Sequence, residues 1–300
     1  VMASTLFAQI TTSSLSGSVK GAGEDPLVGA TIVATHLPTG TKYATSSRGG
    51  GQFLIANMKP GGPYTIEITF VGYDPEKIEN VYLQLAESFV LAPVLKKTNA
   101  TLENVVLTTG RRSQTFNPNR TGAVTNIGLR QITQLPTISR SLNDLTRSTP
   151  QATSRDGSVG GGNYRQNNFT IDGADFNNSF GIGGNLPAGG APISLDAIDE
   201  ISVNITPYDI RQSGFIGSAI NAVTRSGTNT FTGSVYTYFR TERHRGRKVE
   251  NATFVRPPEE FKQYGIRIGG PIIKNKLFFF LNFETENQPK SIQTNFAATA

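Results

Sequence analysis

The sequence predicts a mainly β fold in three parts. An N-terminal Ig-like or prealbumin-like β-sandwich is followed by an α+β domain and then by the first strands of a transmembrane β-barrel. Short runs bounded by Gly and Pro fill residues 15–91 and indicate the sandwich. The only helix-like spacing lies between Ile127 and Gln151. Residues 228–300 carry strands in which apolar and polar side chains alternate, as the lipid and lumen faces of a barrel require.

The composition excludes several classes of function. The 300 residues include no Cys and two His, which excludes Cys-based zinc sites and thiol nucleophiles and leaves little for a catalytic triad. We therefore expect no enzyme, no metal site and no cofactor. The net charge is +6, but the charges are scattered, which argues against nucleic acid as a partner. No run of about 18 apolar residues marks a membrane helix.

Residues 1–9 have the character of a signal-peptide remnant. Val1–Gln9 ends in the small residue Ala8 followed by Gln9, which places a cleavage point near Ala8. A frayed, mildly apolar end is the alternative, because no basic region begins the segment.

Residues 10–95 form the expected sandwich, with turns at Pro38–Gly40 and Pro60–Pro63. Strands are expected at 15–20, 30–36, 42–46, 52–55, 64–71, 80–85 and 88–91. Alternation along them predicts an inward-facing set that comprises Ala30, Ile32, Ala34, Tyr64, Ile66, Ile68 and Phe70.

This part resembles the carboxypeptidase regulatory-like domain over residues 14–92. The resemblance is carried by Ser16–Gly21, Pro26–Val33, Gly51–Ile55, Pro60–Tyr64 and Phe70–Tyr73. It implies a sandwich that occurs on peptidases and as an N-terminal extension of some outer-membrane receptors. An acidic residue commonly precedes the glycine before the aromatic strand in that family, whereas Arg48 and three glycines stand here. Any cation bound through that acidic position is not expected in this copy.

Residues 96–120 form a polar linker with one β-prone island. A lone apolar strand cannot bury itself, so it is either the last strand of the sandwich or a strand offered to the sheet edge of another protein. The island resembles a Ton box, the segment through which outer-membrane receptors bind the energising protein TonB. The residues that would bind TonB are Glu103, Asn104, Val105, Val106, Leu107, Thr108 and Thr109.

Residues 121–227 resemble the plug domain of TonB-dependent receptors. Apolar residues at three- and four-residue spacing predict packing around a helix from Arg140 to Thr146, with Ser139 as its cap. The resemblance is carried by Leu135–Pro136, Phe169–Ala174, Leu195–Val203 and Ala219–Gly227, and the continuation Thr230–Arg240 resembles the Oar-like branch of these receptors.

The resemblance to plug domains also implies roles for two sets of residues. Two loops are expected to face the substrate and contain Arg155, Asp156, Tyr164, Arg165, Asp175, Asn177, Asn178 and Asn185. Two cations, Arg211 and Arg225, are expected to tether the plug to barrel carboxylates by charge-assisted bonds.

Residues 228–300 are expected to hold the first three barrel strands. In Ser234–Arg240, Tyr264–Gly270 and Leu277–Glu284, one face carries mainly apolar side chains. A soluble sandwich would alternate too, but here a charged loop, Thr241–Gln263, is followed by a tight turn, Pro271–Lys276. Barrels alternate long outer loops with short periplasmic turns. The smallest barrels have about eight strands, so we expect the chain to be the N-terminal part of a longer protein.

Together these features predict the N-terminal portion of a TonB-dependent receptor in the outer membrane, with the sandwich and the plug entry on the periplasmic side. The resemblance implies energy-coupled uptake of an unidentified extracellular substrate. The implied partners are the TonB–ExbB–ExbD complex, outer-membrane lipid and, as a further option, a surface lipoprotein. The alternatives are a secreted β-rich adhesion protein whose sandwich binds carbohydrate or protein, and a peptidase-associated module.

Overall fold

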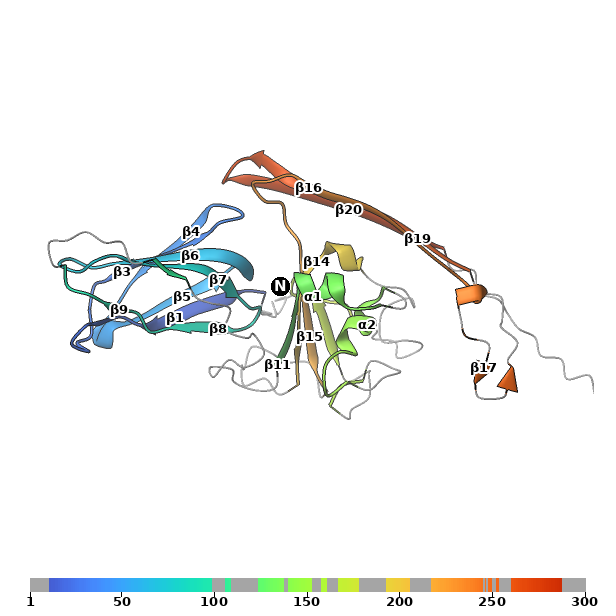
Figure 1. The fold of residues 1–300 in the computed structure, drawn as a ribbon, viewed down its shortest axis with the longest axis horizontal. Coiled ribbons are helices and arrows are strands. Elements are labelled where there is room, and N and C mark those ends of the chain that lie inside the picture. Colours follow the sequence, from blue (N-terminus) through green and yellow to red (C-terminus); the bar gives the residue numbers. More distant parts are fainter. Residues whose placement is uncertain are drawn as a thin grey trace, which may run out of the picture.

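The computed structural model of the chain describes most of its residues. The described ranges are 11–98, 106–108, 124–137, 140–152, 158–160, 167–177, 193–205, 217–244, 246, 248–249, 252–253 and 260–287. The expected signal-peptide remnant lies outside them and stays a prediction. Figure 1 shows three bodies in chain order: a β-sandwich, a middle domain, and a long sheet that extends past the middle domain.

The N-terminal body consists of two facing sheets. The smaller sheet has the order β5-β1-β8 and comprises β1 (Ser13–Ser18), β5 (Gln52–Met58) and β8 (Ser88–Leu91). The larger sheet has the order β10-β7-β6-β3-β4 and comprises β3 (Thr31–His36), β4 (Thr41–Ser46), β6 (Gly61–Thr69), β7 (Glu76–Leu83) and β10 (Val106–Thr108). A short pair, β2 (Lys20–Gly21) and β9 (Val94–Leu95), and the turn η1 (Gly49–Gly51) complete this body.

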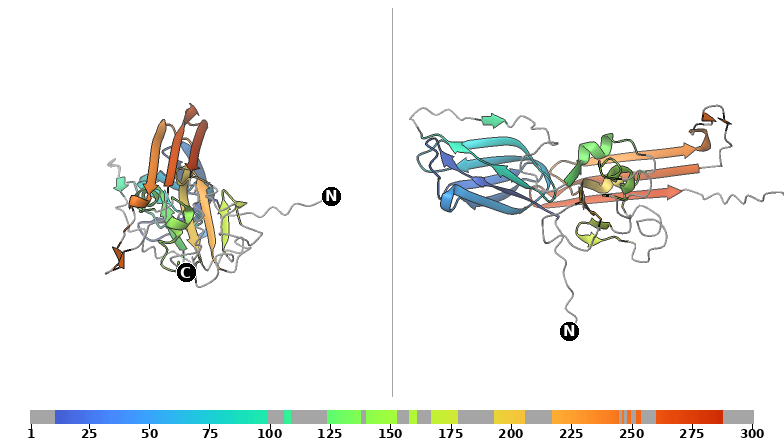
Figure 2. Two further views of the ribbon diagram at one scale, coloured as in Figure 1. Left: turned by 90° about the vertical axis from the view of Figure 1, so that its right-hand side faces the viewer. Right: turned by 90° about the horizontal axis from the view of Figure 1, so that it is seen from below.

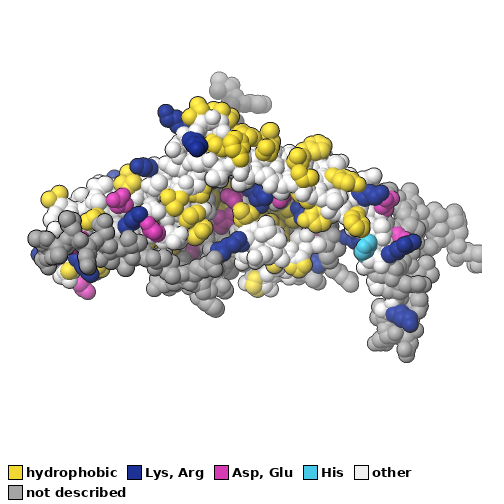
Figure 3. Space-filling view, turned by 45° about the horizontal axis from the view of Figure 1, so that its top comes forward, with side chains coloured by type: hydrophobic (Ala, Val, Ile, Leu, Met, Phe, Trp, Pro, Cys, Tyr) yellow, Lys and Arg dark blue, Asp and Glu magenta, His cyan; other side chains and the backbone are white. Residues whose placement is uncertain are grey.

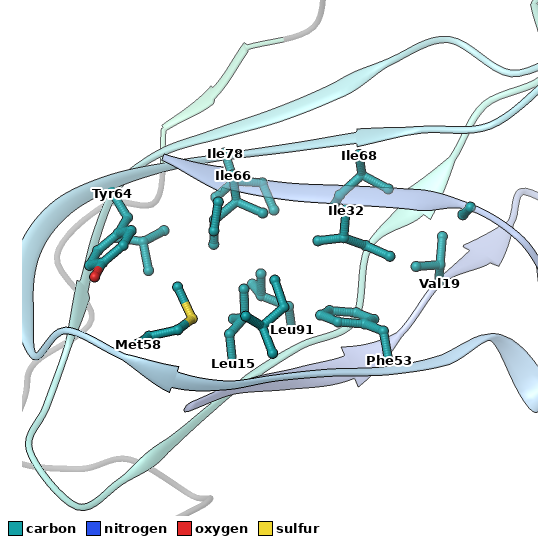
Figure 4. Close-up of a cluster of buried hydrophobic side chains, with 14 of the residues drawn as sticks. Leu15, Val19, Ile32, Phe53, Met58, Tyr64, Ile66, Ile68, Ile78 and Leu91 are labelled. Carbon is teal, nitrogen blue, oxygen red and sulfur yellow. The ribbon is translucent and has the colours of Figure 1, made fainter. Parts of the chain in front are cut away.

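The sandwich core lies between its two sheets (Figure 4). Leu15 and Met58 of the smaller sheet and Tyr64 of the larger one have no exposed surface. The inward-facing set expected from alternation is buried, except that Phe70 is only partly buried and packs against the core. The Tyr64 hydroxyl donates a hydrogen bond of 2.7 Å to the Lys59 carbonyl, so the ring is buried without an unpaired polar group.

The middle domain is a five-stranded sheet with helices on one side. Its order is β11-β14-β15-β12-β13, and it comprises β11 (Val124–Gly128), β12 (Asn168–Ile171), β13 (Ala174–Asp175), β14 (Ile198–Asn204) and β15 (Ala219–Thr224). The helices are α1 (Leu129–Gln134), α2 (Leu142–Thr146) and the short 3-10 turn η4 (Leu195–Ala197). The core joins both kinds of element, since Ile132 and Leu145 pack with Ile201 and Ile220.

The helix-like spacing of the sequence corresponds to two short helices, since Ile132 lies in α1 and Leu142 and Leu145 lie in α2. Ile127, at the start of that range, belongs to β11, where it pairs with Ile201 of β14 and is buried in the core that the helices share. The expected helix begins at Leu142 instead of Arg140, whose φ of 48° is incompatible with a right-handed helix. Ser139 lies outside the described residues.

The last body is an antiparallel sheet with the order β16-β19-β20 (Figure 2). It comprises β16 (Thr232–Thr241), β19 (Glu260–Ile273) and β20 (Leu277–Asn287). The region between β16 and β19 includes η5 (Glu242–His244) and a hairpin of β17 (Lys248–Val249) and β18 (Ala252–Thr253). The tight turn is shorter than expected: β19 continues through Pro271 to Ile273, because a bulge accommodates the proline, and the turn is residues 274–276.

One face of this sheet is apolar and exposed, as alternation predicted (Figure 3). Val235, Ile266 and Phe283 stand in one row across the three strands, and Val235 is 80% exposed. The apolar face also includes Phe239, Tyr264, Ile268 and Leu281. Within the described ranges, no helix has both the length and the apolar character to cross a bilayer.

Candidate functional site: a polar seam between the middle domain and the strand sheet

The inner face of the strand sheet, opposite the exposed apolar face, carries polar side chains that meet the middle domain. In the β16–β19–β20 register, Ser234 lies opposite Arg267, and Tyr236 and Glu284 flank Gly265. We call the contacts of these side chains with Arg140, Ser194 and Asp196 of the middle domain the polar seam.

The first contact of the polar seam is an ion pair. Asp196 Oδ2 lies 2.9 Å from Arg267 Nε, and the two side chains are only 16% and 21% exposed. Ser234 Oγ donates to the same carboxylate oxygen at 2.8 Å and accepts from Arg267 Nε at 2.7 Å. Asp196 therefore has two partners on the strand sheet, and partial burial makes both interactions stronger than an exposed pair would be.

The second contact is centred on Glu284 of β20. Ser194 Oγ donates to Glu284 Oε2 at 2.8 Å, and the Tyr236 hydroxyl donates to the same oxygen. Ser194 also caps η4, because its Oγ accepts the Asp196 N–H at 3.2 Å. One serine thus fixes the position of the Asp196 backbone and binds the strand sheet.

A glycine in β19 makes room for the tyrosine of this contact. A Cβ atom on Gly265 would lie 2.1 Å from Cζ of Tyr236, so the ring lies directly over Gly265 on its way to Glu284. Arg140 of the middle domain adds a cation–π contact, with its Cζ 4.8 Å from the Tyr236 ring centroid and 4.3 Å from that of Tyr238.

The chemistry of the polar seam suits attachment. It has two carboxylates and two guanidinium groups, and each lies close to a partner of complementary character. Among the residues that the structure describes, no three His, Cys, Asp or Glu side chains come together as metal ligands. The seam holds a globular domain against one face of a sheet.

A separate set of contacts, outside the polar seam, joins the sandwich to the middle domain beside β14. The Leu85 N–H, just after β7, donates to Glu200 Oε1 at 3.0 Å, and Asn126 Nδ2 donates to Gln84 Oε1 at 3.1 Å. Burial raises the pKa of Glu200 to about 8; the Leu85 hydrogen bond opposes the rise, while nearby Asp199 and Glu87 add to it. We call this set of contacts the sandwich clamp.

Lys59 of the sandwich faces the same region. Its ammonium donates to Ser226 Oγ. Burial lowers the pKa of Lys59 and raises that of Asp199, while the attraction between the two opposes both shifts. The clamp therefore places ionisable groups from two domains in partly dry surroundings.

The chain passes from the middle domain to the strand sheet over a short junction. The backbone N–H of Arg225 donates to the Ala197 carbonyl at 2.8 Å, and its Nε donates to the Ile198 carbonyl at 3.0 Å. Two residues later, a Cβ on Gly227 would lie 2.3 Å from the Phe279 carbonyl oxygen, so only glycine fits against the sheet backbone there.

The sandwich also reaches this end of the strand sheet. The Asn229 N–H donates to the Pro38 carbonyl at 2.8 Å, and Asn229 exchanges two hydrogen bonds with Asn275 in the turn between β19 and β20. Pro38 belongs to a turn of the sandwich that the sequence predicted.

The residues expected to bind TonB are described only in part. Val106, Leu107 and Thr108 form β10, which pairs in parallel with Lys77, Ile78 and Glu79 of β7. Glu103, Asn104, Val105 and Thr109 lie outside the described residues. The sequence offered two interpretations of this segment, as the last strand of the sandwich or as a strand for another protein. In the structure, β10 lies at the edge of the larger sheet of the sandwich.

The substrate-facing set is also described in part. Asp175 lies in β13 and is exposed. Asn177 accepts the Phe169 N–H at 2.7 Å and donates to Asn168 Oδ1 at 2.7 Å, so its amide holds β12 in place. The other members lie outside the described residues, namely Arg155, Asp156, Tyr164, Arg165, Asn178 and Asn185.

The two expected tethers differ from the attachment that is observed. Arg225 bonds to backbone carbonyls of the middle domain, and no described contact joins it to a carboxylate of the strand sheet. Arg211 lies outside the described residues. In the polar seam the charges are reversed, since the acid Asp196 lies on the middle domain and Arg267 on the sheet.

Sequence analysis missed every member of the polar seam as a functional residue. A signal existed, because Tyr236, Arg267 and Glu284 share the polar face of three predicted strands. Charged residues on a buried face need partners. Alternation alone does not say which residues of the middle domain supply them.

Comparison with known proteins identifies two parts of the chain. Residues 14–96 match the carboxypeptidase regulatory-like domain, and residues 223–300 match an outer membrane beta barrel domain. The TonB-dependent transporter Oar of Myxococcus xanthus is 29% identical over 133 residues, which cover 42% of this chain and 12% of Oar. The chain thus spans a small fraction of that relative. Oar is named as a transporter, which agrees with the expectation that this chain is not an enzyme.

Similarity to solved structures is low. The outer membrane transporter YddB of Escherichia coli aligns with 55% of this chain and 26% of its own, at 16% identity and a TM-score of 0.40. The major pilin SpaD of Corynebacterium diphtheriae aligns with 30% of this chain and 31% of its own, at 19% identity and a TM-score of 0.25. Such scores identify neither fold nor function. The two matched domains indicate a protein of the outer membrane: the chain joins a carboxypeptidase regulatory-like domain to part of an outer membrane beta barrel domain, and it is similar to the TonB-dependent transporter Oar.

Proposed function

We propose that the chain is the gating portion of a TonB-dependent transporter. In this proposal residues 10–95 are a periplasmic sandwich, 96–120 a linker with the Ton box, 121–227 the plug, and 228–300 the first strands of the barrel. The plug closes the barrel lumen until TonB pulls on the Ton box, and a substrate that is not yet identified then passes. The observation that carries the proposal is the polar seam, because it fastens a globular domain to the inner face of a sheet whose other face is apolar and exposed.

The chemistry of the polar seam suits a reversible gate. A hydrogen bond to a charged group contributes about 1.5–3 kcal/mol, so a few such bonds hold a domain firmly at rest. When they break, water can solvate Asp196, Arg267 and Glu284 on both sides. An apolar contact of similar strength would expose apolar surface to water in the lumen each time the gate opened, which is unfavourable.

The proposed partners follow from this arrangement. TonB, energised by ExbB and ExbD, would add residues 103–109 to the edge of its own sheet. Lipid would surround Val235, Ile266, Phe283 and the rest of the exposed apolar face. The substrate would meet the loops around residues 155–165 and 175–185. A surface lipoprotein remains a further proposed partner.

A proline substitution tests the TonB step. Val106→Pro removes a backbone N–H that strand addition needs, whereas Val106→Thr keeps the N–H and the β-branched shape. We expect site-specific crosslinking to TonB in whole cells to fall at least about tenfold for the proline variant and to stay unchanged for the threonine variant. Equal crosslinking of both variants would show that this segment is not the TonB-binding strand.

A further inference from the structure

The outer edge of β7 is a site that accepts an extended strand. In the larger sheet of the sandwich, β7 pairs with β6 on one side and with β10 on the other. Without β10, the N–H and C=O groups on that side of β7 would be unpaired, and such an edge readily accepts another strand. Lys77 and Glu79 form an ion pair of 2.7 Å on the exposed face of β7, beside the register positions of Val106 and Thr108.

The strand that fills this edge is attached in a way that allows it to leave. The β10–β7 pairing is parallel and spans three residue pairs, whereas the other described pairings of the sheet are antiparallel. Parallel pairing is slightly less stable per residue. Ile78, Val81 and Leu83 anchor β7 in the sandwich core, so β7 keeps its place when β10 departs.

The occupant is the same segment that we propose pairs with TonB, and the inference rests on that proposed function. We propose that β7 is the resting dock of residues 106–108 and that TonB must displace the segment from this edge before it can bind. The sandwich would then control access of TonB to the receptor, by competition for one strand.

Chain lengths support the need for release. Thr108 is held beside Glu79, and Asn126 of β11 is held by Gln84, only five residues further along the sandwich chain. Five strand residues span about 17 Å. The chain from Thr108 to Val124 contains 16 residue steps and can extend to roughly 50 Å. The reach of the chain exceeds this span, so a pull on the docked β10 would load its pairing with β7 before it loaded the middle domain.

An engineered disulfide tests the dock in the full-length receptor. Residues 1–300 contain no Cys, and any Cys elsewhere in the receptor is first replaced by Ser, so Lys77→Cys with Val106→Cys places two thiols at one register position in a background free of other thiols. Each single variant is a control for the substitutions. Thr31→Cys with Ser46→Cys, an exposed pair across β3 and β4, is the matched control for a disulfide in the same sheet. The probe is the purified periplasmic domain of TonB, titrated against the receptor in detergent, oxidised and reduced.

We expect the 77–106 disulfide to form on oxidation. Affinity for the TonB domain should then fall at least about tenfold, and reductant should restore it. The receptor with the 31–46 pair should bind the TonB domain equally in the oxidised and reduced states. Failure of the 77–106 disulfide to form would overturn the dock. Equal binding of the oxidised and reduced forms would also overturn it, because TonB would then be adding to the free edge of β10 or binding elsewhere. If even the receptor without substitutions does not bind, the proposed TonB pairing fails, and the competition fails with it.

Discussion

Removal of the ion pair in the polar seam should loosen the middle domain from the strand sheet without unfolding either. Asp196→Ala deletes a carboxylate that binds Arg267 at 2.9 Å and Ser234 at 2.8 Å. Each bond to a charged group contributes about 1.5–3 kcal/mol, and exposure of 16–21% weakens it only in part. We therefore expect the opening free energy of the middle domain to fall by about 2–4 kcal/mol. Arg267→Ala should cost a similar amount.

The assay is native-state hydrogen exchange in the full-length receptor, observed at the amides of β14, where opening of the middle domain has its own free energy. The double variant should lose less than the sum of the two single losses, with a coupling energy of about 1–2 kcal/mol. Asp25→Ala, which removes an exposed carboxylate from the sandwich, is the control. Additive losses would refute the view that the two side chains act as one attachment.

Two further predictions concern the clamp and the glycine of the seam. Burial raises the folded-state pKa of Glu200 to about 8, above its ordinary value of 4.5. The stability that this carboxyl contributes is therefore fully present below pH 4.5 and is lost as the pH rises through 8. The loss is at most about 1.4 kcal/mol per pH unit. Glu200→Gln keeps the acceptor for the Leu85 N–H, so denaturant unfolding across pH 5–9 should give a flatter profile, and parallel profiles would contradict the assignment. Gly265→Ala should displace the Tyr236 ring and lower the exchange free energy at β14 by about 1–3 kcal/mol, whereas Gly246→Ala, with nothing within 4 Å, should have no effect.

The sequence predicts the sandwich and the strand sheet well, because both are governed by alternation. Ile32, Ile66 and Ile68 are buried as expected, and Val235 and Phe239 are exposed on the apolar face. In each case a period of two residues assigns a side chain to a face without knowledge of its neighbours. The middle domain is harder to predict, because the helix-like spacing of Ile132, Leu142 and Leu145 does not mark where each short helix begins.

The polar seam could not be predicted for a different reason. Asp196 and Arg267 are 71 residues apart in the sequence, and each belongs to an element that would be plausible without the other. Their contact depends on how a domain is oriented against a sheet, which local patterns do not encode. The pairing of β10 with β7 is similar: the sequence left two partners open for one strand, and only the structure shows its pairing with the sandwich.

If the middle domain is the plug, as we propose, the short junction between it and the strand sheet limits how it can move. Arg225 is bonded to the middle domain, and Gly227 lies against the backbone of the sheet, so the two bodies are joined through the single residue Ser226, whose hydroxyl is bound by Lys59 of the sandwich. A force delivered through the linker arrives at β11, which lies two strands away from β15 in the order β11-β14-β15, or about 10 Å from the strand that ends at the junction. The force is therefore off-axis and acts as a torque. Under the proposed function, the middle domain would rotate about the junction once the polar seam breaks, and it would leave as a whole only if the bonds of Arg225 also broke.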